Sequence, residues 1–538
     1  MLALLLAICP AGALWLAALV ARRLERPERT VAALAFAVFV LSTLVSPSSY
    51  VHDHYTHFRH ARAAWDDPLL LLDPWDRPAF MLLYAGAARF GLVAARLVSA
   101  IPASLAVAAT MLAAKAAGVR RAWLAGLFIV AQLDFFGQAS STMTELLLAA
   151  GLAVACWGFF AERPWLAAAG LAFAGLTRPE APLLVAACAL LLFVAHRRLG
   201  PVLVAFAPFV AWVALGSALH HDLLWYVHGN PYRGAVGLRL EGRQILESFF
   251  YAALADGQPL PLLLLEIAGA ALVLRRGGRR AAFLLGPVVL LWLLLTFLRI
   301  GPFDWWRQSR YLVSIAPILA LLAAMAYEAL EAHPPRLAAP ALLAASAVGA
   351  GTILAKAWRP FTWSPPWMWA IFAAPLAVGA MAWALRRRVP AEAALAAMLA
   401  APLLFSPPGT FNLHRPTASE RAAEQIVRAL AARGGVAVGY DHSALEQACA
   451  EVVGDPCPLM LRRSDAPTPD DALFVKQYDG TAPPPGPPKG WSEVWSASGP
   501  RIEGPLLSPV AWRTTTMIWE RAPSPHTPAN HSYPWSSQ

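Results

Sequence analysis

Charged residues are scarce in this chain of 538 residues: they make up 14% of it, whereas 58% of the residues are hydrophobic. A soluble globular protein carries roughly 25% charged residues, so this deficit excludes an ordinary soluble domain. Apolar runs close to the roughly 20 residues that cross a bilayer recur from Leu2 to Phe405. We therefore predict an α-helical polytopic membrane protein with about 13–14 transmembrane helices.

The first apolar run lacks the basic segment and the small-residue cleavage site of a signal peptide, so we expect it to remain as a span. The full set of expected spans is 2–21, 31–45, 87–114, 123–138, 145–160, 165–176, 181–194, 202–219, 260–274, 281–298, 311–330, 337–354, 367–385 and 391–405.

Cysteine is also sparse, with five residues in the whole chain. Cys9, Cys156 and Cys188 lie inside apolar runs, where a cysteine is a small core residue. Cys449 and Cys457 lie in a polar tail and could form a disulfide or remain two free thiols, and the sequence does not decide between these alternatives.

Basic residues outnumber acidic ones, which gives a net charge of +10. In a soluble protein this would suggest nucleic acid, but here the arginines gather in short joints after every second span, so no nucleic-acid binding is expected. The positive-inside rule places those joints in the cytoplasm. Loops 46–86, 139–144, 177–180, 220–259, 299–310 and 355–366, with everything after Phe405, are then extracytoplasmic.

Two domains are expected: a multi-span domain over 1–405 and an extracytoplasmic α/β tail over 406–538. The tail gains Asp, Glu, Pro and Ser. Its residue pattern predicts a helix over 418–433 and strands over 436–440, 472–477 and 514–520.

The first outer loop combines an aspartate, Asp53, with His52, His54, His57 and His60. Titratable groups are expensive to keep at a membrane edge, so the cluster suggests function. Asp53 heads an amphipathic stretch that could lie flat in the interface, and its carboxylate is either a helix cap or a general base. The histidine spacing also suggests a metal site, but no thiol or Glu-rich partner stands nearby, so we favour hydrogen bonding and expect no metal or other cofactor.

Further polar groups fall on the same expected face. Asp73, Asp76 and Arg77, in a rigid turn, could bind the acceptor or pair with one another, and Tyr232 lies in a second rigid turn. Arg178 and Arg310 sit at span ends, where guanidinium groups suit a lipid phosphate. Glu145 opens a span and is either a cap stabilised by the helix dipole or part of the site.

The order of these motifs resembles the GT-C superfamily of membrane glycosyltransferases, which includes protein O-mannosyltransferases and lipid A aminoarabinose transferases. The resemblance covers roughly 31–405 and rests on Asp53, His-Ala-Arg-Ala-Ala-Trp (60–65), Asp-Pro-Trp-Asp-Arg-Pro (73–78), Thr-Glu (144–145), Leu-Thr-Arg-Pro-Glu (176–180) and Arg-Tyr (310–311). Many members carry two adjacent acidic residues in the first loop, whereas here histidines flank Asp53.

The resemblance implies transfer of a sugar from a polyprenyl-phosphate donor to a glycan, lipid or protein acceptor, at a site outside the cytoplasm. Asp53 would then be the general base of an inverting displacement, and Arg310 and Arg178 would hold the lipid phosphate. We expect His54, Glu145, Arg178, Tyr232, Arg310, Tyr311, Asp76 and Arg77 to bind substrates, and a bacterial inner membrane as the location. The alternative is a transporter or flippase of a lipid-linked or small anionic substrate, which would fit the span count.

Overall fold

The computed structural model describes residues 2–45, 52–230, 236–238, 242, 260–300, 309–332, 427, 437–440, 460–463, 473–480, 486–503 and 510–521. The chain divides into two compact units. The first contains Met1–Ala357 and Trp363–His414, and the second contains Trp358–Thr362 and Arg415–Gln538.

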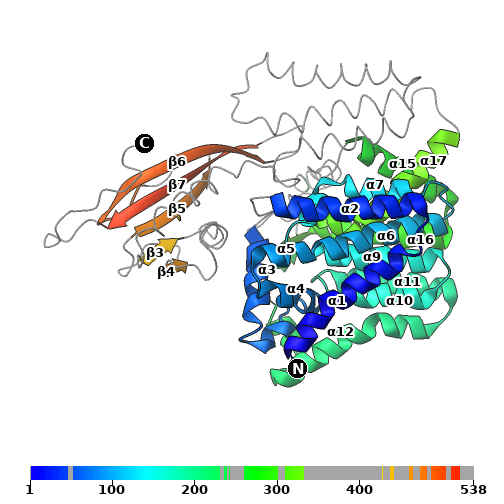
Figure 1. The fold of residues 1–538 in the computed structure, drawn as a ribbon, viewed down its shortest axis with the longest axis horizontal. Coiled ribbons are helices and arrows are strands. Elements are labelled where there is room, and N and C mark those ends of the chain that lie inside the picture. The colour runs from blue at the N-terminus through cyan, green and yellow to red at the C-terminus, as the bar shows by residue number, and fades with distance from the viewer. Residues whose placement is uncertain are drawn as a thin grey trace, which may run out of the picture. The chain divides into compact units, whose positions relative to one another are not determined.

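The first unit is helical (Figure 1). Its elements are α1 (Leu2–Ala21), α2 (Arg26–Val45), α3 (His52–Ala63), η1 (Pro68–Leu72), α4 (Pro78–Ala88), α5 (Leu92–Val98), α6 (Ala100–Ala116), α7 (Trp123–Val130), α8 (Leu133–Gln138), α9 (Glu145–Phe160), α10 (Pro164–Gly175), α11 (Ala181–His196), α12 (Leu199–Leu219), α13 (Trp225–His228), β1 (Val236–Leu238), α15 (Leu260–Arg276), α16 (Gly278–Phe297), β2 (Leu298–Ile300), η3 (Ser309–Ile315) and α17 (Ala316–Ala332).

Five stretches among the described residues are long and apolar enough to cross a membrane: Arg26–Val45, Leu92–Ala116, Leu199–Leu219, Gly278–Phe297 and Arg310–Ala332. Shorter apolar helices lie between them, among them α9, α10 and α11. This confirms a polytopic helical membrane protein. The total of 13–14 spans stays a prediction, because the runs at 337–354, 367–385 and 391–405 lie outside the described residues.

Small residues allow helices α9 and α10 to approach each other closely. In α9 and α10, a Cβ added at Gly158 would lie 2.2 Å from the backbone nitrogen of Ala167, and one added at Gly170 would lie 2.6 Å from that of Ala155. Glycine at these positions lets the two backbones touch, which is how helices gain packing energy inside a membrane. Helices α9, α10, α11 and α12 consequently lie side by side (Figure 1).

Two of the expected spans are wrong in their continuity. The run at 87–114 is interrupted at Gly91, which has a φ of 105° that glycine adopts easily and other residues adopt only with strain. The helical part of this run therefore begins after Gly91 and consists of α5 and α6. The run at 123–138 is split into α7 and α8 at Gln132, whose backbone is extended. The Gln132 side chain instead donates to the carbonyl of Ala316 at 3.0 Å, a tertiary bond that hydropathy does not reveal.

The described part of the second unit is a five-stranded sheet of order β4-β3-β5-β7-β6. The strands are β3 (Ala437–Tyr440), β4 (Met460–Arg463), β5 (Leu473–Gly480), β6 (Trp491–Glu503) and β7 (Val510–Arg521). β3 pairs in parallel with β4 and β5, while β7 pairs antiparallel with β5 and β6. Phe474, Met517 and Trp519 form its buried cluster.

The three expected tail strands are present as β3, β5 and β7. The sequence did not predict β4 or β6, and β6 contains Gly499 and Pro500, which weaken a strand pattern. The helix expected over 418–433 and both tail cysteines lie outside the described residues, apart from Val427.

Candidate functional site

One polar pocket collects side chains from segments far apart in the sequence. Its lining comprises Asp53, His57, Trp75, Met143, Thr144, Glu145, Arg178, Pro179, Arg310 and Tyr311. These residues come from α3, the loop before α4, the start of α9, the α10–α11 turn and η3. Four of the loops predicted to share one face of the membrane therefore meet at one site.

Asp53 stands opposite Arg310. The Asp53 Oδ2 lies 2.7 Å from Arg310 Nη2, and the two side chains are 35% and 13% exposed. The aspartate is thus reachable from solvent while the arginine is nearly buried. The carboxylate of Asp53 therefore faces the pocket, where a general base would have to lie.

Arg178 lies at the centre of a second, almost buried group of ion pairs. Its Nη1 lies 2.8 Å from Glu145 Oε1, and its Nε lies 2.5 Å from Glu180 Oε1. Nη1 also donates to Thr144 Oγ1 at 2.9 Å. Burial alone would lower the pKa of Arg178, but the carboxylates of Glu145 and Glu180 raise it above its ordinary value, so the guanidinium stays charged.

Tyr311 joins the two arginines. The guanidinium carbons of Arg178 and Arg310 lie 5.1 and 5.2 Å from the centre of its ring, within the range of a cation–π contact. Arg310 Nη2 also donates to the Tyr311 hydroxyl at 3.3 Å. Glu145 lies between the arginines, with Oε1 3.9 Å from Arg310 Nε, so the site is one connected network of charges.

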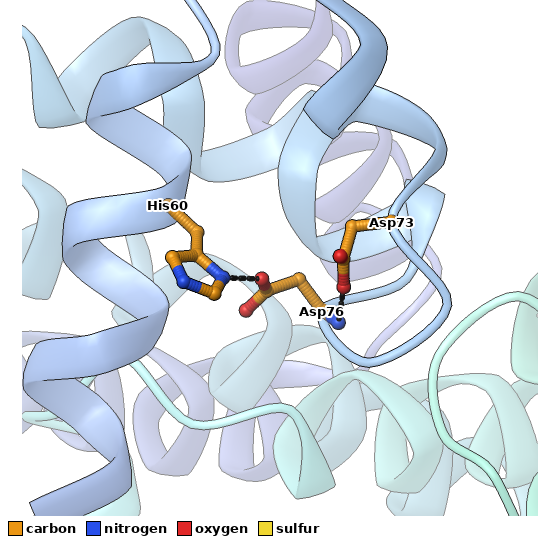
Figure 2. Close-up of side chains that lie close together, drawn as sticks. All are labelled: His60, Asp73 and Asp76. Atoms are coloured by element: carbon orange, nitrogen blue, oxygen red, sulfur yellow. Dashed lines mark hydrogen bonds and ion pairs between the residues drawn. The ribbon is translucent and has the colours of Figure 1, made fainter. Parts of the chain in front are cut away.

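A buried carboxylate behind the pocket holds two histidines. His57 Nδ1 donates to Asp76 Oδ1 at 2.5 Å, and His60 Nδ1 donates to Asp76 Oδ2. Asp76 is fully buried, and Asp73 accepts from the backbone N–H groups of Trp75 and Asp76 at 2.7 and 2.9 Å, which closes the turn (Figure 2).

These surroundings shift the pKa values of Asp76, His60 and Asp73. Burial alone would raise the pKa of Asp76, but the hydrogen bonds from His57 and His60 lower it. The same bond to Asp76 raises the pKa of His60, and burial raises that of Asp73.

The donor atoms of His60, Asp73 and Asp76 lie within 4.8 Å of one another, a spacing that a metal ion could also use (Figure 2). Both oxygens of Asp76 already accept an N–H from an imidazole, and Asp73 accepts from the backbone. Hydrogen bonding therefore accounts for the cluster as it stands, and we interpret it as a carboxylate–imidazole pair that organises the turn.

Buried hydrogen bonds fix the loop that delivers Glu145. Arg96 Nε donates to the carbonyl of Ser140 at 2.7 Å, and Ser99 Oγ donates to that of Ser141. Thr142 Oγ1 donates to the carbonyl of His54 at 2.5 Å, which ties this loop directly to the helix that bears Asp53. Ser140 Oγ and Ser141 Oγ add local bonds, to the carbonyls of Gly137 and Gln138 at 3.0 and 3.1 Å, as short hydroxyl side chains favour.

Arg77 is buried between two aromatic side chains, a position that the sequence did not predict. It is fully buried, does not line the pocket, and its guanidinium lies 5.1 and 5.0 Å from the ring centres of Trp212 and Tyr226. Its Nη2 donates to the Tyr226 hydroxyl at 3.0 Å, and its φ of 70° is unusual for a residue with a side chain. Arg77 thus fastens the first outer loop to α12 and α13.

The other predicted residues divide between the pocket and its surroundings. Asp53, Glu145, Arg178, Arg310 and Tyr311 line the pocket. His54 is buried beside it and Asp76 behind it, while Tyr232 lies outside the described residues. Of the two alternatives for Asp76 and Arg77, the structure does not show their pairing: Asp76 bonds histidines, and Arg77 packs between aromatic rings.

Sequence reasoning missed His57 and Trp75 as pocket residues. The His57 and Trp75 rings stack with centroids 4.4 Å apart. One signal was available: His57 follows Asp53 by four residues, which places both on one face of a helix.

The described helices and the structures that they resemble define the class of fold, a polytopic helical membrane protein, which is the fold class that the sequence predicted. Two solved structures of ArnT from Cupriavidus metallidurans show the likeness. The one bound to undecaprenyl phosphate is 18% identical with a TM-score of 0.59, covering 83% of this chain and 92% of ArnT. The apo structure is 17% identical with a TM-score of 0.58, covering 91% and 97%. No protein-family model and no curated protein matches the sequence.

Proposed function

We propose that this protein transfers a sugar from a polyprenyl-phosphate donor to an acceptor at the extracytoplasmic face of a membrane. The observation that carries the proposal is the pocket in which the reachable carboxylate of Asp53 lies 2.7 Å from Arg310. A carboxylate can accept a proton, and a neighbouring guanidinium can hold a departing phosphate. The fold shared with an ArnT bound to undecaprenyl phosphate supports a lipid phosphate as the leaving group.

In the proposed reaction, Asp53 takes the proton of the acceptor hydroxyl as the acceptor oxygen attacks the anomeric carbon. The bond from that carbon to the phosphate oxygen breaks, its electron pair leaves with the phosphate, and the configuration at the carbon inverts. Arg310 stabilises the charge that develops on the phosphate, because its donors are held in place before the reaction begins. The charge of Arg178 is already balanced by Glu145 and Glu180. In the proposed reaction Arg178 therefore holds Glu145 and Tyr311 in position in the pocket lining.

The orientation follows from the charges at the other end of the helices. Lys115, Arg120, Arg121 and Arg279 lie on the joints that the positive-inside rule places in the cytoplasm. The pocket lies at the opposite ends of α9 and α17, which supports the proposal that it faces outward. A bacterial inner membrane is the location we propose.

The test is transfer by purified protein in detergent, with tritiated undecaprenyl-phosphate sugars as donors and cell-envelope extract as acceptor. Asp53→Asn should lower the rate at least about 100-fold, because an amide cannot accept the proton. Asp66→Asn is the matched control: the same change in the same loop, at an exposed residue outside the pocket. Wild-type rates from Asp53→Asn would reject Asp53 as the base.

The same assay separates an enzyme from a transporter or flippase. Detergent leaves no sealed compartment, so a labelled product can form only by chemistry. A protein that moves the lipid across liposome membranes but forms no product in detergent would support transport instead.

We propose further that no resident metal ion takes part. The carboxylate and imidazole groups behind the pocket hydrogen-bond to one another, and the phosphate has guanidinium partners for its charge. Activity should therefore survive exhaustive chelation and dialysis. Loss of activity that zinc or manganese restores would contradict this part of the proposal.

A further inference from the structure

His57 lines the pocket but has no role in the reaction proposed above. It follows Asp53 by one helical turn, and both side chains line the pocket. The His57 Nδ1 is bound to Asp76, so Nε2 is the ring nitrogen left to meet a group in the pocket. Its ring is held in place by stacking on Trp75 and by Phe80, whose ring centre lies 5.2 Å away.

Asp76 is arranged to support a charged imidazole. It is fully buried, and its second oxygen accepts from His60, which fixes the orientation of the carboxylate. A buried carboxylate bonded to Nδ1 selects the tautomer with a free lone pair on Nε2 and stabilises the imidazolium that forms when Nε2 takes a proton.

Asp53, by contrast, is a poor place for the proton to remain after it has left the acceptor. Its carboxylate faces Arg310 at 2.7 Å, and protonation would give up that attraction. Before a second turnover, the proton must leave Asp53, and the pocket wall offers an imidazole one turn away.

We propose that His57, oriented by Asp76, is the proton carrier that regenerates Asp53 after each sugar transfer. This inference rests on the proposed function. After the acceptor proton has moved to Asp53, it passes from the carboxyl oxygen to His57 Nε2. The electron pair of the broken O–H bond stays on Asp53, which becomes a carboxylate again, and His57 becomes an imidazolium paired with Asp76. The imidazolium then releases the proton to water at the pocket opening.

His57→Asn tests this step, because the asparagine amide can still donate to Asp76 in place of Nδ1 but has no group in place of Nε2. With the tritiated undecaprenyl-phosphate sugars and envelope extract, kcat should fall about 10- to 100-fold while the donor KM stays within about twofold. Free imidazole, added at constant pH, should restore the rate in proportion to its concentration.

His60→Asn is the matched control. His60 makes the same kind of bond to Asp76 through the other oxygen, but it does not line the pocket. We expect its kcat to remain within about twofold of the wild type, with no response to imidazole. If both variants lose the same activity and imidazole restores neither, the histidines serve only to hold the turn and the inference is wrong.

The remaining outcomes are also decisive. Wild-type kcat in His57→Asn would overturn the inference and leave the proposed function intact, since the wild type would still form product. Absence of product from the wild type itself would overturn the proposed function. If His57→Asn fails to fold, as judged by thermal unfolding in detergent, His57→Gln provides the same imidazole-rescue measurement.

Discussion

The two ends of the helical unit carry the same kinds of ion pair in opposite surroundings. At the pocket end, Arg178 lies 2.8 Å from Glu145, with the two side chains 9% and 0% exposed. At the far end, Arg120 lies 2.6 Å from Glu328, with 70% and 22% exposed. Helix α9 connects these ends, and its 16 residues span about 24 Å.

The difference shows what each set of charges does. The exposed pairs at the far end, which also include Arg121–Glu331 and Lys115–Glu25, keep most of their hydration and stabilise little. Buried pairs lose hydration, so their mutual attraction only partly offsets the cost of burying them. The cluster at the pocket end holds three carboxylates and two arginines, of which only Asp53 is substantially exposed, so we infer that these charges serve a purpose other than stability.

Among the variants that compare the two ends, Arg310→Met should lower the transfer activity most. It removes the donors proposed to hold the phosphate and the cation that lies 2.7 Å from Asp53 Oδ2. Truncating one partner of a buried charge pair costs about 2–5 kcal/mol, so kcat/KM for the donor should fall by about 30-fold or more. Steady-state kinetics against donor concentration measure it, and unchanged donor dependence would remove Arg310 from the site.

Arg178→Met should have the largest effect on stability. It removes the cation that lies 2.8 Å from Glu145 and 2.5 Å from Glu180, and among the described residues Glu145 then faces only Arg310, at 3.9 Å. Breaking a buried ion pair in this way costs about 3–5 kcal/mol. Thermal unfolding in detergent is the measurement, with Arg120→Met as the equivalent change at the exposed end. A shift no larger than that of the control would show that water reaches the Arg178 cluster.

The pair of His60 and Asp76 should make stability depend on pH. The pKa of His60 is raised, so its contribution is complete below its unfolded pKa of about 6.5 and is lost as the pH rises through the folded value. The pKa of Asp76 is lowered, so its contribution is complete above its unfolded pKa of about 3.9 and is lost as the pH falls through the folded value.

The difference in melting temperature between the wild type and His60→Ala should therefore be greatest between about pH 4 and pH 6.5. Thermal unfolding across pH 4 to 9 measures it. A difference that stays constant across this range would contradict the ion pair.

Arg120→Gln should have the smallest effect, at most about 1 kcal/mol, because its pair with Glu328 is largely hydrated. Added salt should make even this difference disappear. A loss as large as that of Arg178→Met would show that the two ends are not as different as their exposure indicates.

Much of the site could be predicted because the side of the membrane on which a loop lies depends on the charges of the neighbouring joints, which can be read from the sequence. Asp53, Arg178 and Arg310 were expected on one face from the alternation of arginine-rich joints, and the structure brings all three into one pocket. Glu145 could have been a cap or a site residue by its sequence, and its contacts with Arg178 and Arg310 place it in the pocket.

The sequence by itself determined that the chain is a polytopic membrane protein and that residues from four of its loops share a face. Hydropathy and charge are sufficient for this, because water and lipid select residues by type wherever they stand in the chain. Only the tertiary structure decided that His57 turns to Asp76 and that Arg77 packs between Trp212 and Tyr226. These choices depend on which helices touch, and a contact across 149 residues of sequence leaves no mark in the local pattern.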